Sequence, residues 1–195
     1  MAGPNKGSRC TWVGDDPLML QYHDKEWGVP VHDDRRLFEF IVLEGAQAGL
    51  NWMTVLRRRE AYRAAFADFD PIKVARFDRR KLESLMRNEA IIRNRRKIEG
   101  TIQNARAYLS LREIGKTLSD FMWDFVGGKP ITNRRKNISQ IPASTPESDA
   151  MSKAMKKAGF TFFGTTICYA HMQAAGMVND HLVTCFRYRE LLRAR

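Results

Sequence analysis

Apolar residues recur at intervals of three and four along almost the whole chain, while strictly alternating apolar and polar runs are nearly absent. This periodicity predicts an all-α protein of about eight or nine helices. Residues that favour helix starts and stops fall where the pattern needs them. The expected starts are Asp16-Pro17, Asp33 and Asp34, Asp70-Pro71 and Thr145-Pro146, and the expected stops are Gly159 and Gly176.

One stretch interrupts the helical pattern. Residues 127–148, "GGKPITNRRKNISQIPASTPES", are rich in Gly, Pro, Ser and Asn. Such a composition favours turns over helix, so we expect an exposed loop here. The chain contains neither an internal repeat nor a low-complexity segment.

The charge balance indicates the kind of partner. The 195 residues carry 33 Lys and Arg against 22 Asp and Glu, a formal charge of +11, and 44% of them are hydrophobic. A chain of this length and composition can bury a core of its own, and its charge favours a polyanion such as nucleic acid. A membrane surface is the second candidate. No apolar run approaches the roughly 18 residues of a spanning helix, so we expect no membrane partner.

The three cysteines predict a reducing compartment. An odd number of cysteines does not suit a disulfide framework, and the opening "MAGPNKGS" lacks the apolar core of a signal peptide. We therefore expect a cytoplasmic protein whose thiols are free to bind a metal.

The sequence "NDHLVTC" places His181 four residues before Cys185. If this stretch is helical, the two side chains share a face and can hold one ion. The alternative is a buried thiol packed beside a hydrogen-bonded histidine.

Further ligands are available near the start of the chain. Cys10 and His23 are separated by twelve residues, and His23 falls on the first predicted helix. Two Cys and two His form a ligand set that suits structural zinc, although this spacing is unlike that of a zinc finger. The spacing alone leaves other ligands open, namely His32, His171 and Cys168.

Glu44 interrupts an apolar stripe. Within "FEFIVLEGAQAGLNW", residues 38–52, it follows Leu37, Phe40 and Ile41 at helical spacing. It is either a carboxylate that snorkels or pairs with an arginine, or an acceptor or base inside an apolar pocket. Tyr22 and Trp52 are candidates to form the walls of that pocket, although each alone would suit a core position.

Residues 82–108 predict a helix, a short hairpin and a second helix. Basic residues gather where the second helix starts: Arg93, Arg95, Arg96 and Lys97. Backbone N–H groups at a helix N-terminus, reinforced by cations, can bind a DNA phosphate. A basic run can also be a solvated face, which is the alternative for residues 57–59, 79–81 and 134–136.

Five segments together resemble the 3-methyladenine DNA glycosylase I family of the helix-hairpin-helix superfamily. They are "RCTWV", "YHDKEWGVP", "LEGAQAGLNW", "GTTICYAHMQA" and "NDH", and the similarity runs from about residue 9 to 186. The resemblance implies a helix-hairpin-helix fold and a base-excision repair activity. In that activity 3-methyladenine is flipped out of double-stranded DNA and its N-glycosidic bond is hydrolysed, releasing the free base.

The resemblance also implies roles for individual residues. Residues matching Cys10, His23, His181 and Cys185 bind one structural Zn²⁺ in the family. Those matching Glu44, Tyr22 and Trp52 line the base pocket, with Trp12 and Trp27 close by. Leu50, after Gly49, matches a residue that wedges into the base stack. The sequence departs from the family pattern at Ala90 and Arg96, where glycine is common, and at Met19, where some relatives have an aromatic residue.

The resemblance implies a division of the chain as well. We expect a disordered tail at residues 1–8 and one glycosylase unit over residues 9–195. A central helix-hairpin-helix lobe spans about 37–126, and residues 9–36 and 143–195 form a zinc-clasped helical lobe. We expect a monomer that associates with the bacterial nucleoid through DNA.

Two other functions remain compatible with the residues. One is a glycosylase that also nicks the strand, with Lys97 as the Schiff-base amine. The other is a zinc-clasped module that binds DNA or methylated bases without cleaving them.

Overall fold

The computed structural model describes residues 7–193, which are mostly helical. Eleven α-helices, three 3₁₀ helices and one pair of short strands make up this part of the chain. In order they are α1 (Pro17–Lys25), α2 (Asp34–Gln47), α3 (Trp52–Leu56), α4 (Arg59–Ala65), η1 (Ala67–Phe69), α5 (Pro71–Val74), α6 (Arg79–Arg87), α7 (Arg95–Glu113), α8 (Leu118–Trp123), η2 (Asp124–Val126), β1 (Ile131–Thr132), η3 (Ile138–Gln140), α9 (Pro146–Lys157), α10 (Thr165–Ala174), β2 (Val178–Asn179) and α11 (Phe186–Arg193).

The predicted helix starts are confirmed at α1, α2, α5 and α9. Asp16, Asp33, Asp70 and Thr145 each accept a hydrogen bond from a backbone N–H of the first turn. Such a cap satisfies a donor that the helix itself cannot pair, and it contributes about 1 kcal/mol.

The number of helices was underestimated. Among the described residues the additional ones are short, such as α3, α5 and α8 with four to six residues each. A helix of that length spans too few turns to establish a hydrophobic period, so the pattern could not reveal it.

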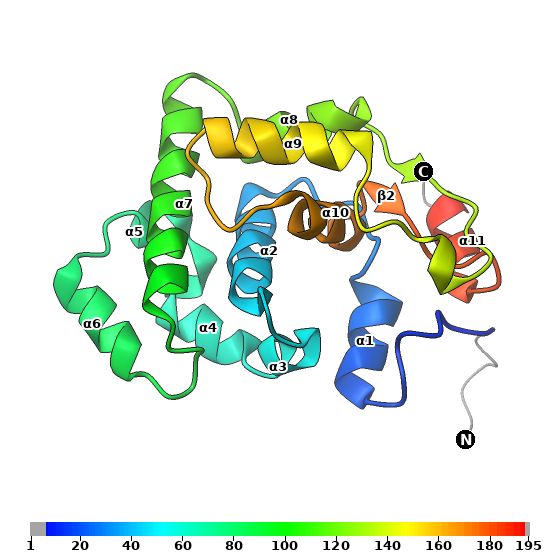
Figure 1. The fold of residues 1–195 in the computed structure, drawn as a ribbon, viewed down its shortest axis with the longest axis horizontal. Helices are drawn as coiled ribbons and strands as arrows, with labels where there is room; N and C mark the ends of the chain where they lie inside the picture. The colour runs from blue at the N-terminus through cyan, green and yellow to red at the C-terminus, as the bar shows by residue number, and fades with distance from the viewer. Residues whose placement is uncertain (1–6, 194–195) are drawn as a thin grey trace.

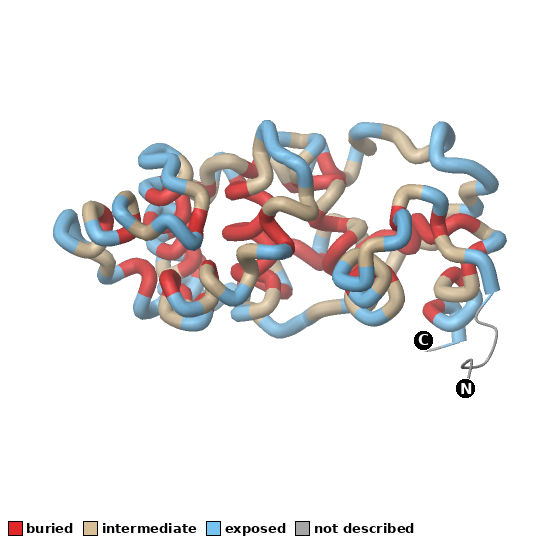
Figure 2. Tube along the Cα trace, turned by 90° about the horizontal axis from the view of Figure 1, so that it is seen from below, coloured by how far each residue is buried: buried red, intermediate tan, exposed pale blue. Residues whose placement is uncertain are grey.

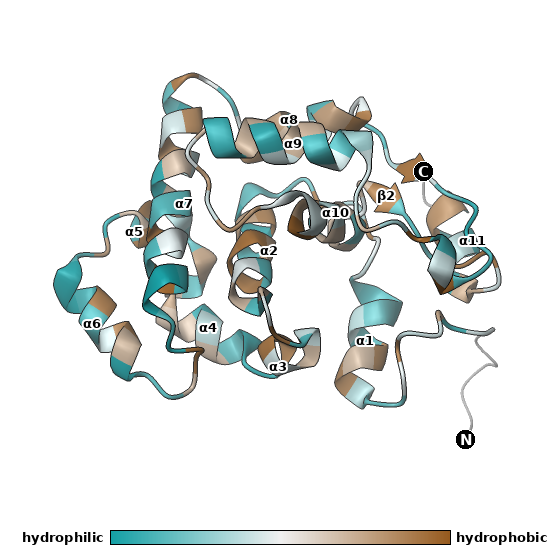
Figure 3. Ribbon diagram, viewed as in Figure 1, coloured by the Kyte–Doolittle hydropathy of each residue, from teal (hydrophilic) through white to brown (hydrophobic). Residues whose placement is uncertain are grey.

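Helix α2 lies at the centre of the molecule (Figure 1) and packs against α3, α7, α8 and α10. Ten consecutive residues of α2, Leu37 to Ala46, are buried. In Figure 2 the buried segments run through the interior along the length of the molecule. Helices α5, α6 and the lower half of α7 form one end, and α11 and β2 form the other. In Figure 3 hydrophilic colours recur on α6, α9 and the first turn of α7.

The predicted loop at residues 127–148 is only partly exposed. Arg134 and residues 136–140 are exposed. The loop also contains β1, which pairs in parallel with β2. The backbone N–H of Val183 donates to the carbonyl of Arg135 at 2.9 Å. Composition predicted the turns here but not the pairing, because that pairing depends on a partner almost fifty residues away.

A smaller apolar cluster joins the two ends of the chain. It contains Cys10, Val13, Tyr22, Trp27, Leu182 and Cys185 among its buried members. Ser8 adds two hydrogen bonds, one from its hydroxyl to the carbonyl of Thr184 and one to its own carbonyl from the N–H of Phe186. Of the tail predicted at residues 1–8, residues 1–6 lie outside the described part.

Gly176 ends α10 as predicted, and two features require glycine there. Its φ is +70°, and a Cβ would lie 2.4 Å from Pro30 N. The left-handed conformation and the close approach let the segment before α2 pack onto the end of α10. The N–H of Val31 then donates to the carbonyl of Ala175.

A buried carboxylate ties α2 to α4. Glu39, 1% exposed, pairs with Arg59 at 2.8 Å, with Arg63 at 2.9 Å and also with Arg36. Three arginines therefore compensate one carboxylate that has left water.

No helix in the described residues is long and apolar enough to cross a membrane.

We expect Glu39→Ala to lower the free energy of unfolding by about 3 kcal/mol, because removing one partner of a buried ion pair leaves uncompensated charge. Denaturant unfolding measures the change. Glu60→Ala is the matched control, since Glu60 also pairs with Arg63 but its side chain is 81% exposed. Its effect should stay below about 1 kcal/mol. Equal effects of the two substitutions would refute this account of the Glu39 network.

Candidate functional site

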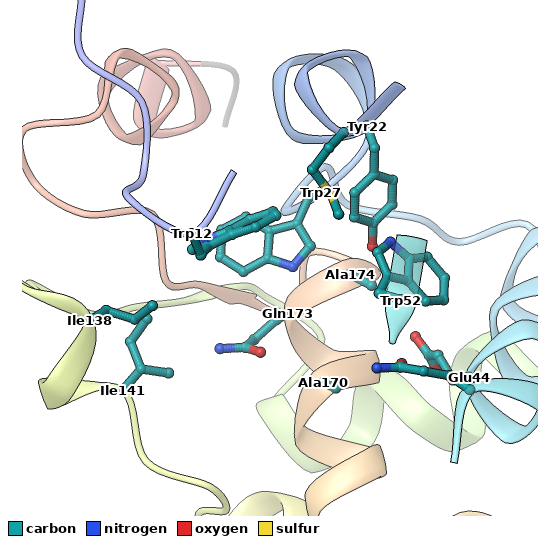
Figure 4. A pocket seen from close by; sticks show the side chains of 12 residues that line it. Trp12, Tyr22, Trp27, Glu44, Trp52, Ile138, Ile141, Ala170, Gln173 and Ala174 are labelled. Carbon is teal, nitrogen blue, oxygen red and sulfur yellow. The ribbon is translucent and has the colours of Figure 1, made fainter. Parts of the chain in front are cut away.

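A pocket of about 290 Å³ lies between α1, α2, α3, α10 and the 127–148 segment (Figure 4). This volume is near the lower limit of small-molecule sites, which span about 300–1,000 Å³. The walls are mostly apolar and carry a few polar atoms, so a flat ligand of one or two rings suits them. The lining residues are Trp12, Met19, Tyr22, Trp27, Glu44, Gln47, Trp52, Ile138, Ile141, Ala170, Gln173 and Ala174.

Aromatic rings form one side of the pocket. The ring centroids of Trp12 and Trp27 lie 5.0 Å apart, edge to face, and those of Tyr22 and Trp52 lie 5.3 Å apart. Burial, and then the charge of Glu44, raise the pKa of Tyr22, so its hydroxyl stays protonated at neutral pH. These rings offer a cation the negative faces of their π systems.

Glu44 contributes the pocket's carboxylate. It is 3% exposed, as the helical spacing predicted, and its Oε2 lies 2.9 Å from Nδ1 of His171 on α10. The sequence left open a carboxylate paired with an arginine and an acceptor or base in an apolar pocket. The partner in the structure is not an arginine but this buried histidine. Burial raises the pKa of Glu44, while the charge and hydrogen bond of His171 oppose that shift.

Two polar atoms in the pocket have no partner among the described residues. Glu44 Oε1 and Trp52 Nε1 are both buried without a hydrogen bond. An unsatisfied buried polar group costs about 1–3 kcal/mol. A ligand with a donor for Glu44 and an acceptor for Trp52 would remove both costs.

A second constellation lies beside the pocket. The ligand atoms of Cys10, His23, His181 and Cys185 lie within 4.8 Å of one another, and all four residues are buried. Cys10 Sγ is 3.5 Å from His181 Nδ1, and Cys185 Sγ is 3.5 Å from His23 Nε2 and 3.6 Å from His181 Nδ1. The structure therefore brings together the four residues singled out in the sequence.

The outer hydrogen bonds fix which ring nitrogen faces the sulfurs. Nδ1 of His23 lies 2.8 Å from Asp24 Oδ1, and Nε2 of His181 lies 3.0 Å from the carbonyl of Trp27. Both oxygens are acceptors, so these nitrogens carry the hydrogens. His23 Nε2 and His181 Nδ1 consequently direct lone pairs at the two thiols. Metal-binding histidines generally have such partners.

Asp24 is itself held in place. Arg9 donates to both of its oxygens, at 2.9 and 2.8 Å, and this ion pair lowers the pKa of Asp24 to about 2. The carboxylate therefore stays ionised and keeps its hydrogen bond to His23.

The backbone around His181 and Cys185 differs from the prediction. Residues 181–185 form turns, and α11 begins only at Phe186. The N–H of His181 is bound by Asn179 Oδ1, and the N–H of Leu182 by Cys10 Sγ. These bonds favour a turn because side chains accept from N–H groups that a helix would pair with its own carbonyls.

The alternative ligands have other surroundings. His32 stacks on Trp123 with ring centroids 4.2 Å apart, and His171 holds Glu44. Cys168 is buried in the larger core cluster. None of these three residues belongs to the cluster of Cys10, His23, His181 and Cys185.

The cluster and the pocket share structural elements. Trp12 follows Cys10 by two residues, Tyr22 adjoins His23, and the Trp27 ring lies against His181 with centroids 4.6 Å apart. Any group that fixes the four ligands therefore also fixes three aromatic walls of the pocket.

The predicted hairpin is present as α6, residues 88–94 and α7. Arg93, Arg95 and Arg96 are exposed around the start of α7. Arg93 pairs with Glu89 at 3.3 Å and Arg95 with Glu83 at 2.9 Å. Ala90 and Arg96, where the resemblance implies that glycine is common, are absent from the described non-glycine residues with positive φ. The hairpin therefore does not require glycine at either position.

Lys97 has a different environment from the three arginines. Its Nζ donates to the carbonyls of Ala46 at 2.8 Å and Ala48 at 2.6 Å. Lys97 thus holds the turn after α2, which continues to Gly49 and Leu50. Gly49 has a φ of +77°, and Leu50 is 43% exposed at the tip.

Sequence reasoning missed the partner of Glu44 and several residues that line the pocket. His171 appeared only as a possible metal ligand, and Gln173, Ile138 and Ile141 were not singled out. The spacing of Ala170, Gln173 and Ala174 puts them on one face of α10, which was the available signal. No local signal showed that this face lies opposite Glu44.

Comparisons with known proteins agree with this geometry. The sequence model of the methyladenine glycosylase family matches residues 12–188. The chain is 54% identical to DNA-3-methyladenine glycosylase 1 of Escherichia coli K12, over 92% of this chain and 96% of that protein. It is 49% identical to DNA-3-methyladenine glycosylase of Haemophilus influenzae, over 91% and 96% of the two chains.

Solved structures show the same fold. A crystal structure of 3-methyladenine DNA glycosylase I superposes with a TM-score of 0.90 at 54% identity, covering 92% of this chain and 98% of that one. The Staphylococcus aureus enzyme, studied for its recognition of 3-methyladenine, superposes with a TM-score of 0.88 at 34% identity, covering 94% and 96%. The chain belongs to the methyladenine glycosylase family.

Proposed function

We propose that the chain excises 3-methyladenine from double-stranded DNA by hydrolysing the N-glycosidic bond. The observation that carries the proposal is the unpaired Oε1 of Glu44 in an aromatic pocket. Several relatives are named for this activity, which is consistent with the proposal.

The chemistry of the lesion suits this pocket. Methylation at N3 leaves the base cationic and electron-poor, so it is already a good leaving group. The aromatic walls attract the cation, and a charge-assisted hydrogen bond to Glu44 adds selectivity. Unmodified adenine lacks the positive charge, so both contacts stabilise it less. His171, which holds the other carboxylate oxygen, orients Glu44 for this role.

The duplex must release the base before it can enter the pocket. Leu50 is an exposed apolar side chain on the turn after α2, and Gly49 gives that turn its left-handed conformation. We propose that Leu50 wedges into the stack when the nucleotide leaves it.

The alternative strand-nicking mechanism lacks support from the geometry. A Schiff base requires a free, reactive amine on Lys97. Its Nζ instead donates to two carbonyls of the turn after α2. The simple glycosylase reaction therefore remains the proposal.

We expect methylated duplex DNA incubated with the protein to release free 3-methyladenine, identified by mass spectrometry. Glu44→Gln keeps the shape of the side chain and removes its charge. It should weaken binding of free 3-methyladenine about tenfold, since a hydrogen bond to a charged partner contributes about 1.5–3 kcal/mol. Excision should slow while duplex binding is maintained. If Glu44→Gln binds and excises 3-methyladenine as well as the parent does, Glu44 has only a structural role and the proposal for it is wrong.

We further propose that Cys10, His23, His181 and Cys185 bind one structural zinc ion. Tetrahedral zinc with bonds of about 2.0–2.3 Å places its ligand atoms about 3.3–3.8 Å apart. Three of the six distances between ligand atoms, at 3.5–3.6 Å, fit this geometry, and all six are within 4.8 Å. Zinc would neutralise the thiolates and join the N-terminal segment to the turn before α11.

We expect the purified protein to contain one zinc per chain by elemental analysis. Cys185→Ala should lower both the zinc content and the melting temperature, because metal binding contributes to folding. Cys168→Ala is the matched control, as a buried cysteine outside the cluster. It should retain full zinc. A stable, zinc-free parent would exclude the proposed site.

We also propose that the hairpin grips the DNA backbone through Arg93, Arg95, Arg96 and the N-terminus of α7. Their exposure and the charge of +11 support this. A phosphate would replace the acidic partners that Arg93 and Arg95 have now.

Replacing Arg95 and Arg96 together by Ala should remove about two phosphate contacts. The slope of log affinity against log salt concentration should then become shallower by about 2, because each contact releases about one counterion. Fluorescence anisotropy at several salt concentrations measures the slope. The control replaces Lys153 and Lys156, exposed on α9, and removes the same charge. If both double variants behave alike, the DNA is bound elsewhere than on the hairpin.

A further inference from the structure

Two glutamines line the pocket, but only one has a fixed amide. Nε2 of Gln173 on α10 donates to Oδ2 of Asp180 at 2.9 Å. Among the described residues, the Gln47 side chain has no such fixed partner. The Gln47 amide can therefore turn to present either its oxygen or its nitrogen to a ligand, whereas that of Gln173 cannot.

Asp180 fixes the orientation of the Gln173 amide, and the other polar neighbours of Asp180 are hydrogen-bond donors as well. It is 1% exposed and receives Tyr169 Oη–H at 2.6 Å and Asn133 Nδ2–H at 2.7 Å. Arg135 Nε lies 3.6 Å from its Oδ1. Turning the amide would direct the Gln173 carbonyl at a buried carboxylate, placing two acceptors against each other.

The carbonyl oxygen of Gln173 is left for the pocket. It makes no hydrogen bond within residues 7–193, and the side chain reaches from α10 into the space between the two isoleucines and Glu44 (Figure 4). Glu44 Oε1, which is buried without a hydrogen bond, is a second acceptor of fixed orientation in the pocket.

We propose that Gln173, oriented by Asp180, is a specificity-determining residue that accepts a hydrogen bond from the exocyclic amino group of the methylated adenine. This inference rests on the proposed function. An amino group carries two N–H donors and needs two acceptors once it has left water. Glu44 Oε1 accounts for one and Gln173 Oε1 for the other.

The same arrangement disfavours a methylated guanine. Guanine has a carbonyl oxygen where adenine has the amino group. This oxygen is itself an acceptor, and it would lie against two further acceptors, Glu44 Oε1 and Gln173 Oε1. A site with fixed acceptors discriminates against such a base, because the mismatch leaves buried groups unpaired. Asp180 acts through Gln173 and is therefore a positioning residue.

The test measures binding of free 3-methyladenine and free 3-methylguanine by tryptophan fluorescence, together with release of both bases from methylated duplex DNA. Gln173→Leu removes the acceptor at nearly constant volume. It should weaken 3-methyladenine binding about tenfold and lower the preference over 3-methylguanine by a similar factor. Gln47→Leu, the matched control, should affect the two bases alike and leave their ratio unchanged.

Asp180→Asn tests the positioning role. An amide at this position can donate to Gln173, so the Gln173 nitrogen can turn to the pocket and the preference should fall at least as far as in Gln173→Leu. An unchanged ratio in folded Asp180→Asn would overturn the positioning role. If this variant does not fold, Gln173→Leu alone decides whether Gln173 discriminates.

An unchanged preference in Gln173→Leu would overturn the inference. Failure of the proposed function gives a different result, because the parent itself would then release no methylated base.

Discussion

The buried hydrogen bond between Glu44 and His171 is the interaction on which the candidate site depends. It joins the central helix α2 to α10 and holds one carboxylate oxygen, while the other faces the pocket unpaired. A carboxylate in apolar surroundings is costly unless it is compensated. His171 supplies part of that compensation, and we propose that a cationic base supplies the rest. Part of the binding free energy would then come from relieving the desolvation cost of Glu44 that the free protein already carries.

The cysteine and histidine cluster provides the frame for the pocket. It fixes residues 9–13 and α1 against the turn at 181–185, and these elements carry Trp12, Tyr22 and Trp27. Asp180 precedes His181 directly and orients Gln173 in the pocket wall. The turn at 181–185 thus supplies His181 and Cys185 to the cluster, while Asp180, just before it, supports the pocket wall. We propose that the aromatic rings and Glu44 recognise the charge of the lesion, and that Glu44 and Gln173 recognise its amino group.

Residues that depend on local patterns could be predicted from the sequence. Helical spacing predicted that Glu44 is buried, and Asp-Pro and Thr-Pro pairs predicted the starts of α1, α5 and α9. The prediction was incomplete where the answer depends on distant contacts. His171 gave no sign that it faces Glu44, 127 residues away, and Lys97 gave none that it holds the turn after α2. The turn at 181–185 likewise depends on Cys10, which binds the N–H of Leu182.

A crystal structure of the protein with bound 3-methyladenine tests the central claim most directly. We predict that the base lies among the aromatic rings with a donor within about 3 Å of Glu44 Oε1, while Oε2 remains bonded to His171. A base that binds outside this pocket would contradict the account. So would a Glu44 carboxylate that leaves His171 or makes no contact with the ligand.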